Sequence, residues 1–340
     1  MEVRPVDPSD EDELEEWTAV LRASDKDLWP DVTGFTLSDI RAFAQHRSRS
    51  RRFDLLAARQ SDGQILGVGM MDLSLRDNLG SAEVIVGVHP ARRRRGVGTA
   101  IVDAMAERGR ADGRVVLNSI VDAPLGRATD DASLWFAPKV GFEVMLSGNI
   151  RHLAVPPDGG RLEELRAEVA RGRDAAAYRV LTFEAPWPPK YIEDQCALFR
   201  CMSTDEPHGD AGHEEEVWDA DRVSENDSLR VARGARFLVA VAEHRASGRL
   251  VACTELLLAD DVPQQAWQML TVVRPEHRGH RLGLAIKIAN AEELVRRAPE
   301  VRVIITGNAA VNAPMIAVNE MMGFEIVSEG NFWQKRLELA

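Results

Sequence analysis

The chain repeats itself, and this repeat limits the folds that are open to it. The segment FDLLAARQSDGQILGVGMMDL at residues 53–73 has a counterpart, FLVAVAEHRASGRLVACTELLL, at residues 237–258, and both predict two strands joined by a turn. Residues of the same type also recur 185 positions apart: Gly63 and Gly248, Pro90 and Pro275, Arg93 and Arg278. Because self-similarity at a fixed spacing marks a duplicated structural unit, we expect two copies of one fold.

The order of expected elements is the same in both halves. An opening strand is followed by two helices, a strand hairpin, a third strand, a longer helix, a fourth strand, a short helix and a last strand after Gly-Phe. This order predicts the α+β class, with a mixed, mostly antiparallel sheet flanked by helices, because regular βαβ alternation is missing. We place the domains at residues 1–157 and 176–340, with a linker at 158–175, because PPDGG at residues 156–160 and a charged, helix-like stretch at 162–171 have the character of a connector.

Composition and charge exclude several classes of protein. The 340 residues are 45% hydrophobic and 28% charged, with a formal net charge of -12. A general nucleic-acid or membrane-surface binder is therefore not expected. The acidic start of the chain and the lack of a long apolar run favour a cytoplasmic protein. Three cysteines without CxxC spacing predict neither disulfides nor a metal site.

An arginine-rich turn is the strongest chemical signal. The segment RRRGVG at residues 93–98 follows an expected strand that ends near Val88, and it leads into an amphipathic helix. Backbone N–H groups at such a helix start, glycines without side chains and forked arginines together suit a pyrophosphate. The rival motifs fit poorly: the chain has no GxxxxGK(S/T) P-loop and no GxSxG, and the third glycine of a dinucleotide-binding loop is missing.

These residues resemble the GCN5-related N-acetyltransferase (GNAT) superfamily, whose acetyl-coenzyme A loop follows (Gln/Arg)-x-x-Gly-x-(Gly/Ala) after a Val-x-Pro strand end. The first copy matches this pattern with Arg93, Gly96 and Gly98, whereas the second copy has Arg278 and Gly283 but Arg281 at the middle glycine. The tandem arrangement is similar to that of two-domain actinobacterial acetyltransferases of the mycothiol synthase type. The resemblance covers nearly the whole chain, once in each half.

The resemblance implies that acetyl-coenzyme A, as cosubstrate, contacts the two loops and the strand ends before them. The pantetheine arm of the cofactor is expected to lie between two splayed strands, hydrogen-bonded like an added strand. Asn308 and Asn312 match positions near that arm, although both also suit turn and N-cap roles. The expected cofactor-binding residues are Val88, Arg93, Arg94, Arg95, Gly96, Val97, Gly98, Thr99, Val273, Arg278, Gly279, His280, Arg281, Leu282, Gly283, Asn308 and Asn312.

The catalytic residues are less clearly marked. The usual proton donor of the family is a tyrosine four residues before Gly-Phe, and the chain has Ala137 and Asn319 there. Since Asn319 is able to bond the sulfur or a water, we expect the second copy to be catalytic. Glu255 is the preferred base, with Glu83 and the C-terminal carboxylate as alternatives.

A polar segment of the second copy has two open interpretations. The segment EPHGDAGHEEE contains His208 and His213, which we assign to a loop and not to a metal site. The carboxylates Asp205, Glu206 and Asp210 suit either a lid that attracts a cationic acceptor or a solvated loop.

Taken together, we expect an N-acetyltransferase that moves acetyl from acetyl-coenzyme A to a primary amine of a small molecule by direct attack in a ternary complex. No nucleic-acid or membrane partner and no metal are expected. The alternative is a non-catalytic coenzyme A sensor, which the missing tyrosines would explain. The sequence leaves open the identity of the acceptor amine and the oligomeric state.

Overall fold

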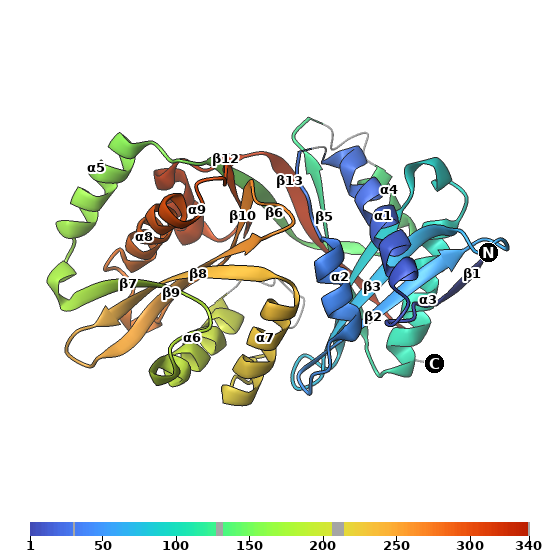
Figure 1. Cartoon of the computed structure of the whole chain (residues 1–340), viewed down its shortest axis with the longest axis horizontal. Coiled ribbons are helices and arrows are strands. Elements are labelled where there is room, and N and C mark those ends of the chain that lie inside the picture. Colours follow the sequence, from blue (N-terminus) through green and yellow to red (C-terminus); the bar gives the residue numbers. More distant parts are fainter. Residues whose placement is uncertain (30, 127–131, 206–213, 339–340) are drawn as a thin grey trace. The chain divides into compact units, whose positions relative to one another are not determined.

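The computed structural model describes residues 1–29, 31–126, 132–205 and 214–338, and Figure 1 shows their elements in chain order. The chain forms two compact units. Both units belong to the expected α+β class, and in both the sheet is mixed and mostly antiparallel. The units are described separately below.

Unit 1 contains a six-stranded sheet in the order β1-β2-β3-β4-β5-β13. Among the strand pairs of unit 1 that the structure describes, β4–β5 is the parallel one. Helices cover both faces: a Cβ atom on Gly69 of β3 would meet Met105 of α3, whereas one on Gly87 of β4 would meet Leu21 of α1. The elements are β1 (Glu2–Pro5), α1 (Glu11–Leu28), α2 (Leu37–Gln45), β2 (Arg51–Arg59), β3 (Ile65–Ser74), β4 (Ser81–Val88), α3 (Val97–Ala111), β5 (Val116–Pro124), α4 (Ala132–Lys139) and β13 (Ser328–Arg336).

Unit 2 repeats this order, with strands β7-β8-β9-β10-β11-β6 and the short β12 beside β6. Here the β10–β11 pair is the parallel one. One local difference is a β-bulge in β10 between Gln268 and Leu270, which β4 does not have. The elements are β6 (Glu143–Ala154), α5 (Gly159–Ala170), β7 (Tyr178–Glu184), α6 (Ile192–Asp205), α7 (Ala220–Ala232), β8 (Ala235–His244), β9 (Arg249–Ala259), β10 (Gln265–Val273), α8 (Leu282–Arg297), β11 (Val303–Ala309), α9 (Ala313–Met322) and β12 (Glu325–Ile326).

The two halves of the sequence exchange their last strands. Residues 328–340 belong to unit 1, whereas unit 2 begins at Gly148 within β6. The strand β13 pairs with the whole of β5, from Ser328 opposite Pro124 to Arg336 opposite Val116. The observed units therefore differ from the division at residues 158–175 that we expected, because the sequence repeat marks copied segments and not the strands with which they pair. The expected linker contains α5, which packs into unit 2 through Leu162 and Leu165.

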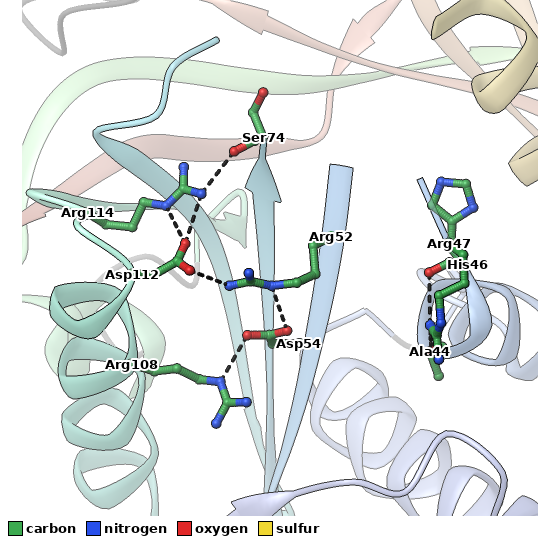
Figure 2. A network of polar contacts seen from close by, with 9 residues as sticks. All are labelled: Ala44, His46, Arg47, Arg52, Asp54, Ser74, Arg108, Asp112 and Arg114. Carbon is green, nitrogen blue, oxygen red and sulfur yellow. Dashed lines mark hydrogen bonds and ion pairs between the residues drawn. The ribbon is translucent and has the colours of Figure 1, made fainter. Parts of the chain in front are cut away.

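A polar network holds α3 at the end away from its loop (Figure 2). Asp112, which caps the C-terminus of α3, accepts hydrogen bonds from Arg52 of β2 at 2.9 Å and from Arg114 at 3.0 Å. The Arg114 side chain also donates to the carbonyl oxygens of Ser81 and Ser74. These contacts tie the C-terminal end of α3 to the three strands β2, β3 and β4, and so they help to fix the position of the arginine-rich turn at the other end of the helix.

The strand exchange predicts where a core mutation acts. Trp333 of β13 packs in the core of unit 1, whereas Phe324, nine residues earlier, packs in the core of unit 2. Replacing either by alanine should cost about 3 to 5 kcal/mol of unfolding free energy. In hydrogen exchange, Trp333→Ala should lower protection in α3 and β5, and Phe324→Ala in α8 and β11. Loss of protection in α8 on the Trp333 change would contradict the exchange.

Candidate functional site

In each unit the two parallel strands pair briefly and then diverge. The β4–β5 pairing runs from Ser81 opposite Val116 to Glu83 opposite Asn118, and the β10–β11 pairing covers the three residues Gln265–Trp267. Beyond Glu83, the Ser119 hydroxyl donates to the Val84 carbonyl at 2.9 Å. The backbone edges that separate after this point are available to an extended ligand that bonds like a strand.

The first loop follows β4 directly and has two left-handed residues. Arg94 has φ 63° and Gly96 has φ 78°, and α3 then begins at Val97 without a side-chain cap. Alternating left-handed positions turn successive N–H groups toward one side, and the uncapped helix start adds further donors. The loop is therefore built as an anion site.

The second loop has the same backbone with its residues exchanged. Gly279 has φ 80° and Arg281 has φ 59°, and α8 begins at Leu282, again without a side-chain cap. Gly279 corresponds to Arg94, and Arg281 corresponds to Gly96, at the 185-residue spacing. The arginine at the expected middle glycine thus keeps the left-handed backbone, at the cost of its strain.

Arg93 and Arg278 brace their loops. Arg93 donates to the Val88 carbonyl at 3.3 Å and to Asp27 of α1 at 2.5 Å. Arg278 repeats this pattern with the Val273 carbonyl at 3.1 Å and with Asp205 of α6. Each guanidinium group thus joins the carbonyl at its strand end to a carboxylate on a helix, and its expected contact with phosphate stays a prediction.

The remaining cations differ between the loops. Arg94 and Arg95 are exposed and have no hydrogen bond or ion pair within the described residues. In the second loop Arg281 pairs with Glu168 of α5, and His280 Nδ1 lies 3.1 Å from the Arg173 carbonyl oxygen. The first loop therefore offers two free cations to an anion, whereas the second carries an acidic neighbour.

The other residues expected to bind the cofactor lie at the helix starts after the two loops and at the start of α9. Gly98 is tightly packed, since a Cβ atom there would lie 2.9 Å from Phe136, whereas the nearest atom to a Cβ at Gly283 would be 3.9 Å away. Thr99 is half-buried in the first turn of α3, and Val97 and Leu282 are core residues. Asn312 caps α9 by accepting from the Met315 N–H at 3.3 Å, which is a structural role.

Glu255 lies in a buried ion pair. Its side chain is 0% exposed, accepts from Trp187 Nε1 at 3.0 Å and is 2.6 Å from Arg230 Nη2 of α7. A carboxylate held in this way is not open to an acceptor amine. Glu83, in contrast, is exposed at the point where β4 and β5 diverge, and it accepts from Asn118 Nδ2 at 2.8 Å.

Several sequence expectations fall outside the described residues. The C-terminal carboxylate, Glu206, His208, Asp210 and His213 belong to this set. Within the described part of the chain, no group of three or more His, Cys, Asp or Glu side chains is arranged to hold a metal. No helix there is both long and apolar enough to cross a membrane.

Three buried titratable groups were missed by the sequence reasoning. Burial raises the pKa of Asp25 and of Asp122 to about 6, and burial lowers the pKa of Lys287 to about 7. Asp122 lies on β5 opposite Gly330, where a Cβ atom would come within 2.9 Å of its carboxylate oxygen. Single charged residues in amphipathic elements resemble surface positions, so no local sequence pattern marks them.

Comparisons with known proteins agree with this geometry. The acetyltransferase (GNAT) family profile matches residues 14–127. A tandem GNAT protein from the clavulanic acid biosynthesis pathway, solved without acetyl-CoA, is 27% identical, with a TM-score of 0.79 and coverage of 100% of this chain and 99% of that chain. None of the curated proteins matches the sequence.

Two more distant structures share the fold. A GCN5-related N-acetyltransferase from Sphaerobacter thermophilus is 14% identical, with a TM-score of 0.65 and coverage of 99% and 96% of the two chains. The glucosamine N-acetyltransferase region of a fungal β-N-acetylglucosaminidase is 15% identical, with a TM-score of 0.64 and coverage of 98% of this chain and 38% of that one. The chain belongs to the GNAT superfamily and contains its fold twice in tandem.

The buried Glu255 pair predicts a stability effect. Glu255→Gln leaves Arg230 without a charged partner at that position and should lower the unfolding free energy by about 3 to 5 kcal/mol. Urea unfolding measures this loss. The control is Glu193→Gln, because Glu193 is 83% exposed in its pair with Arg249, and it should change stability by less than about 1 kcal/mol. Equal effects would contradict a stabilising role for Glu255.

Proposed function

We propose that the protein is an N-acetyltransferase that transfers acetyl from acetyl-coenzyme A to a primary amine of a small molecule. The observation that carries this proposal is that the strand divergence leads directly into a left-handed loop at an uncapped helix start, in both units. The loop suits the pyrophosphate of coenzyme A, and the open strand edge suits its pantetheine arm. GNAT membership supports the same chemistry.

The reaction is direct attack in a ternary complex. The amine nitrogen bonds to the thioester carbon, the tetrahedral oxyanion accepts a strand N–H, and the carbon–sulfur bond breaks to give the amide and the coenzyme A thiolate. An alkyl ammonium has a pKa near 10.4, so its deprotonation at pH 7 costs about 4 to 5 kcal/mol. A small-molecule acceptor is supported by the full-length relative from clavulanic acid biosynthesis, a pathway that makes a small molecule.

The two copies are proposed to have different functions, with tight cofactor binding in the first and catalysis in the second. Arg94 and Arg95 favour tight cofactor binding in the first copy. The second copy is proposed to be catalytic because Asn319, where the family tyrosine is expected, has polar contacts to Asn308 of β11. Its counterpart Ala137 is buried in an apolar core and has no polar side-chain atom to offer.

A non-catalytic coenzyme A sensor is the second candidate. The observation in its favour is that Glu255, the preferred base, is buried in an ion pair with Arg230. Release of free thiol from acetyl-coenzyme A across a panel of amines separates the two functions. Cofactor binding without turnover across amino sugars, polyamines and amino-acid amides would favour the sensor.

A matched pair of loop variants tests which copy binds. Gly96→Asp and Arg281→Asp place a carboxylate at the same left-handed position of each loop, a conformation that aspartate tolerates. Each should weaken coenzyme A binding at its own loop by about 1 to 3 kcal/mol, measured as stoichiometry and affinity by titration calorimetry. Gly96→Asn and Arg281→Asn are the uncharged controls and should bind more tightly than the aspartate variants.

The same variants locate catalysis. If the second copy is catalytic, Arg281→Asp should lower kcat/KM for the amine at limiting acetyl-coenzyme A, and Gly96→Asp should leave it nearly unchanged. The reverse pattern would move catalysis to the first copy. Undiminished binding in all four variants would overturn the assignment of the loops as the cofactor site.

A further inference from the structure

Unit 2 contains a lysine inside its core. Lys287 lies on α8, and its side chain is 2% exposed. Within the described residues its Nζ is not in an ion pair with any carboxylate, and its contacts are Asn319 Oδ1 at 2.7 Å and the ring of Phe324 at 5.0 Å. An isolated charge in such a place is costly unless something requires it.

The charged side chains on the elements packed around Lys287 are engaged elsewhere. Helix α8 contributes carboxylates that pair with arginines of α5 and of its own last turn, and α9 contributes a carboxylate that pairs with β6. These pairs are Glu292 with Arg166, Glu293 with Arg296 and Arg297, and Glu320 with Arg151. The amide of Asn319 is therefore the polar group that meets Lys287.

Lys287 fixes the direction of a short hydrogen-bond chain. A lysine ammonium only donates, so the Asn319 atom that it contacts is the carbonyl oxygen. Asn319 then directs its own Nδ2 to Asn308 Oδ1, at 2.5 Å. Both oxygens are thus occupied, and the amide group of Asn308 is left with its Nδ2–H bonds free to donate. Lys287 determines this orientation, which side-chain amides do not determine by themselves.

The end of this chain lies on the diverging strand edge. Ile305 is the last residue of β11 that pairs with β10, and Asn308 follows three residues later, where β11 pairs with β6 alone. Asn308 is half-buried, and its Nδ2 has no partner in the described part of the chain. The Asn308 side chain faces the side of the sheet that α8 and α9 cover, because it contacts Asn319 of α9. The second loop leads into α8 on this same side. A cofactor that runs from that loop into the strand opening passes Asn308.

The first copy supplies an internal comparison. Lys287 corresponds to Val102 at the 185-residue spacing, Asn319 to Ala137 four residues before Gly-Phe, and Asn308 to Val121 as the sixth residue of its strand. All three counterparts are apolar: Val102 and Ala137 are buried in the unit 1 core, and Val121 is half-buried against it. The same packing space is thus filled by apolar side chains without loss of the fold. Three positions from three different elements change together, which is the pattern of a functional unit and not of isolated substitutions.

We propose that Lys287 is a positioning residue that acts through Asn319 to hold the Asn308 Nδ2–H toward the thioester sulfur, where it stabilises the departing coenzyme A thiolate. This inference rests on the proposed function and deepens it. When the amine attacks, the electron pair of the breaking carbon–sulfur bond goes to sulfur, and the proton of the amine leaves to solvent. The Asn308 donor meets the new negative charge, and the Lys287 contact keeps the Asn319 amide oriented behind it in a low-dielectric interior.

The first test is the acidity of bound coenzyme A thiol, which needs no turnover. In a Gly96→Asp background, confirmed by calorimetry to bind one molecule per chain, thiolate absorbance is titrated against pH. The bound thiol should have a pKa about one unit below that of free coenzyme A, a tenfold change in acidity. Lys287→Met and Asn308→Ala should each abolish this shift, and the double variant should show no further loss.

Stability separates this role from packing. Burial lowers the pKa of Lys287 from 10.5 to about 7, so the unfolded chain binds more protons than the folded one between these values. The loss of unfolding free energy that the buried Lys287 causes is therefore largest below pH 7, and it disappears as the pH rises toward 10.5. Lys287→Met should therefore be more resistant to urea than the wild type at pH 6, and this gain in resistance should be smaller at pH 9. The kcat of the same variant should fall at least tenfold.

A second variant keeps the core intact but removes the donor. Asn319→Asp gives Lys287 a charged partner and is expected to fold, yet a carboxylate has no N–H to offer Asn308. The lowering of the pKa of the bound coenzyme A thiol should again be lost. Retention of the shift in Asn319→Asp or in Lys287→Met would overturn the proposal, as would lower stability of Lys287→Met at pH 6.

The outcomes also distinguish the inference from the proposed function. A chain that releases no thiol with any amine but still acidifies bound coenzyme A in a Lys287-dependent way contradicts the transferase and supports the thiolate site. Normal turnover with an unshifted thiol overturns the Lys287 proposal and leaves the transferase. No binding at the second loop in the Gly96→Asp background also overturns the Lys287 proposal, and the first copy then carries the reaction.

Discussion

Everything proposed for this protein depends on two parallel strands that stop pairing after three residues. A backbone edge released from a sheet must find other partners, because buried N–H and C=O groups without hydrogen bonds are costly. In unit 1 the Ser119 hydroxyl supplies one such partner for Val84, directly past the last pair. The turn that follows each diverging strand is left-handed at the same two positions, so in each unit the open edge leads along the chain directly into the proposed anion site.

The two copies use this common framework with different side chains. The first has free arginines at its loop and an apolar interior behind its strand opening. The second has its loop arginine paired with Glu168 and carries the Lys287–Asn319–Asn308 chain. Duplication allows such a division, because one copy is able to lose a feature that the other retains. The second interior therefore carries a desolvation cost at Lys287 that the first avoids with Val102.

The sequence predicts the local elements well and their partners poorly. The second half shows the expected order of elements, including the opening strand at residues 178–184 and the longer helix at residues 282–297, because periodicity and flanking turns are local signals. The partner of β13 is not predictable in this way, since strand pairing is decided by contacts far along the chain. Alternation places Glu255 on one face of its strand but does not show that Arg230 covers it. Lys287 lies on an amphipathic helix, and a lysine in such a helix is ordinarily exposed, so its burial is not predictable from the sequence.

The strand exchange has a consequence for how the protein is made. Unit 1 receives its last strand from residues 328–336, which leave the ribosome about 180 residues after the rest of that unit. At roughly 5 to 20 residues per second, the N-terminal half waits about 10 to 40 s with the edge of β5 uncovered. A strand edge left open for that time pairs readily with other chains. The order of synthesis thus makes the N-terminal half, and not the C-terminal half, the part of this chain that depends on protection before translation ends.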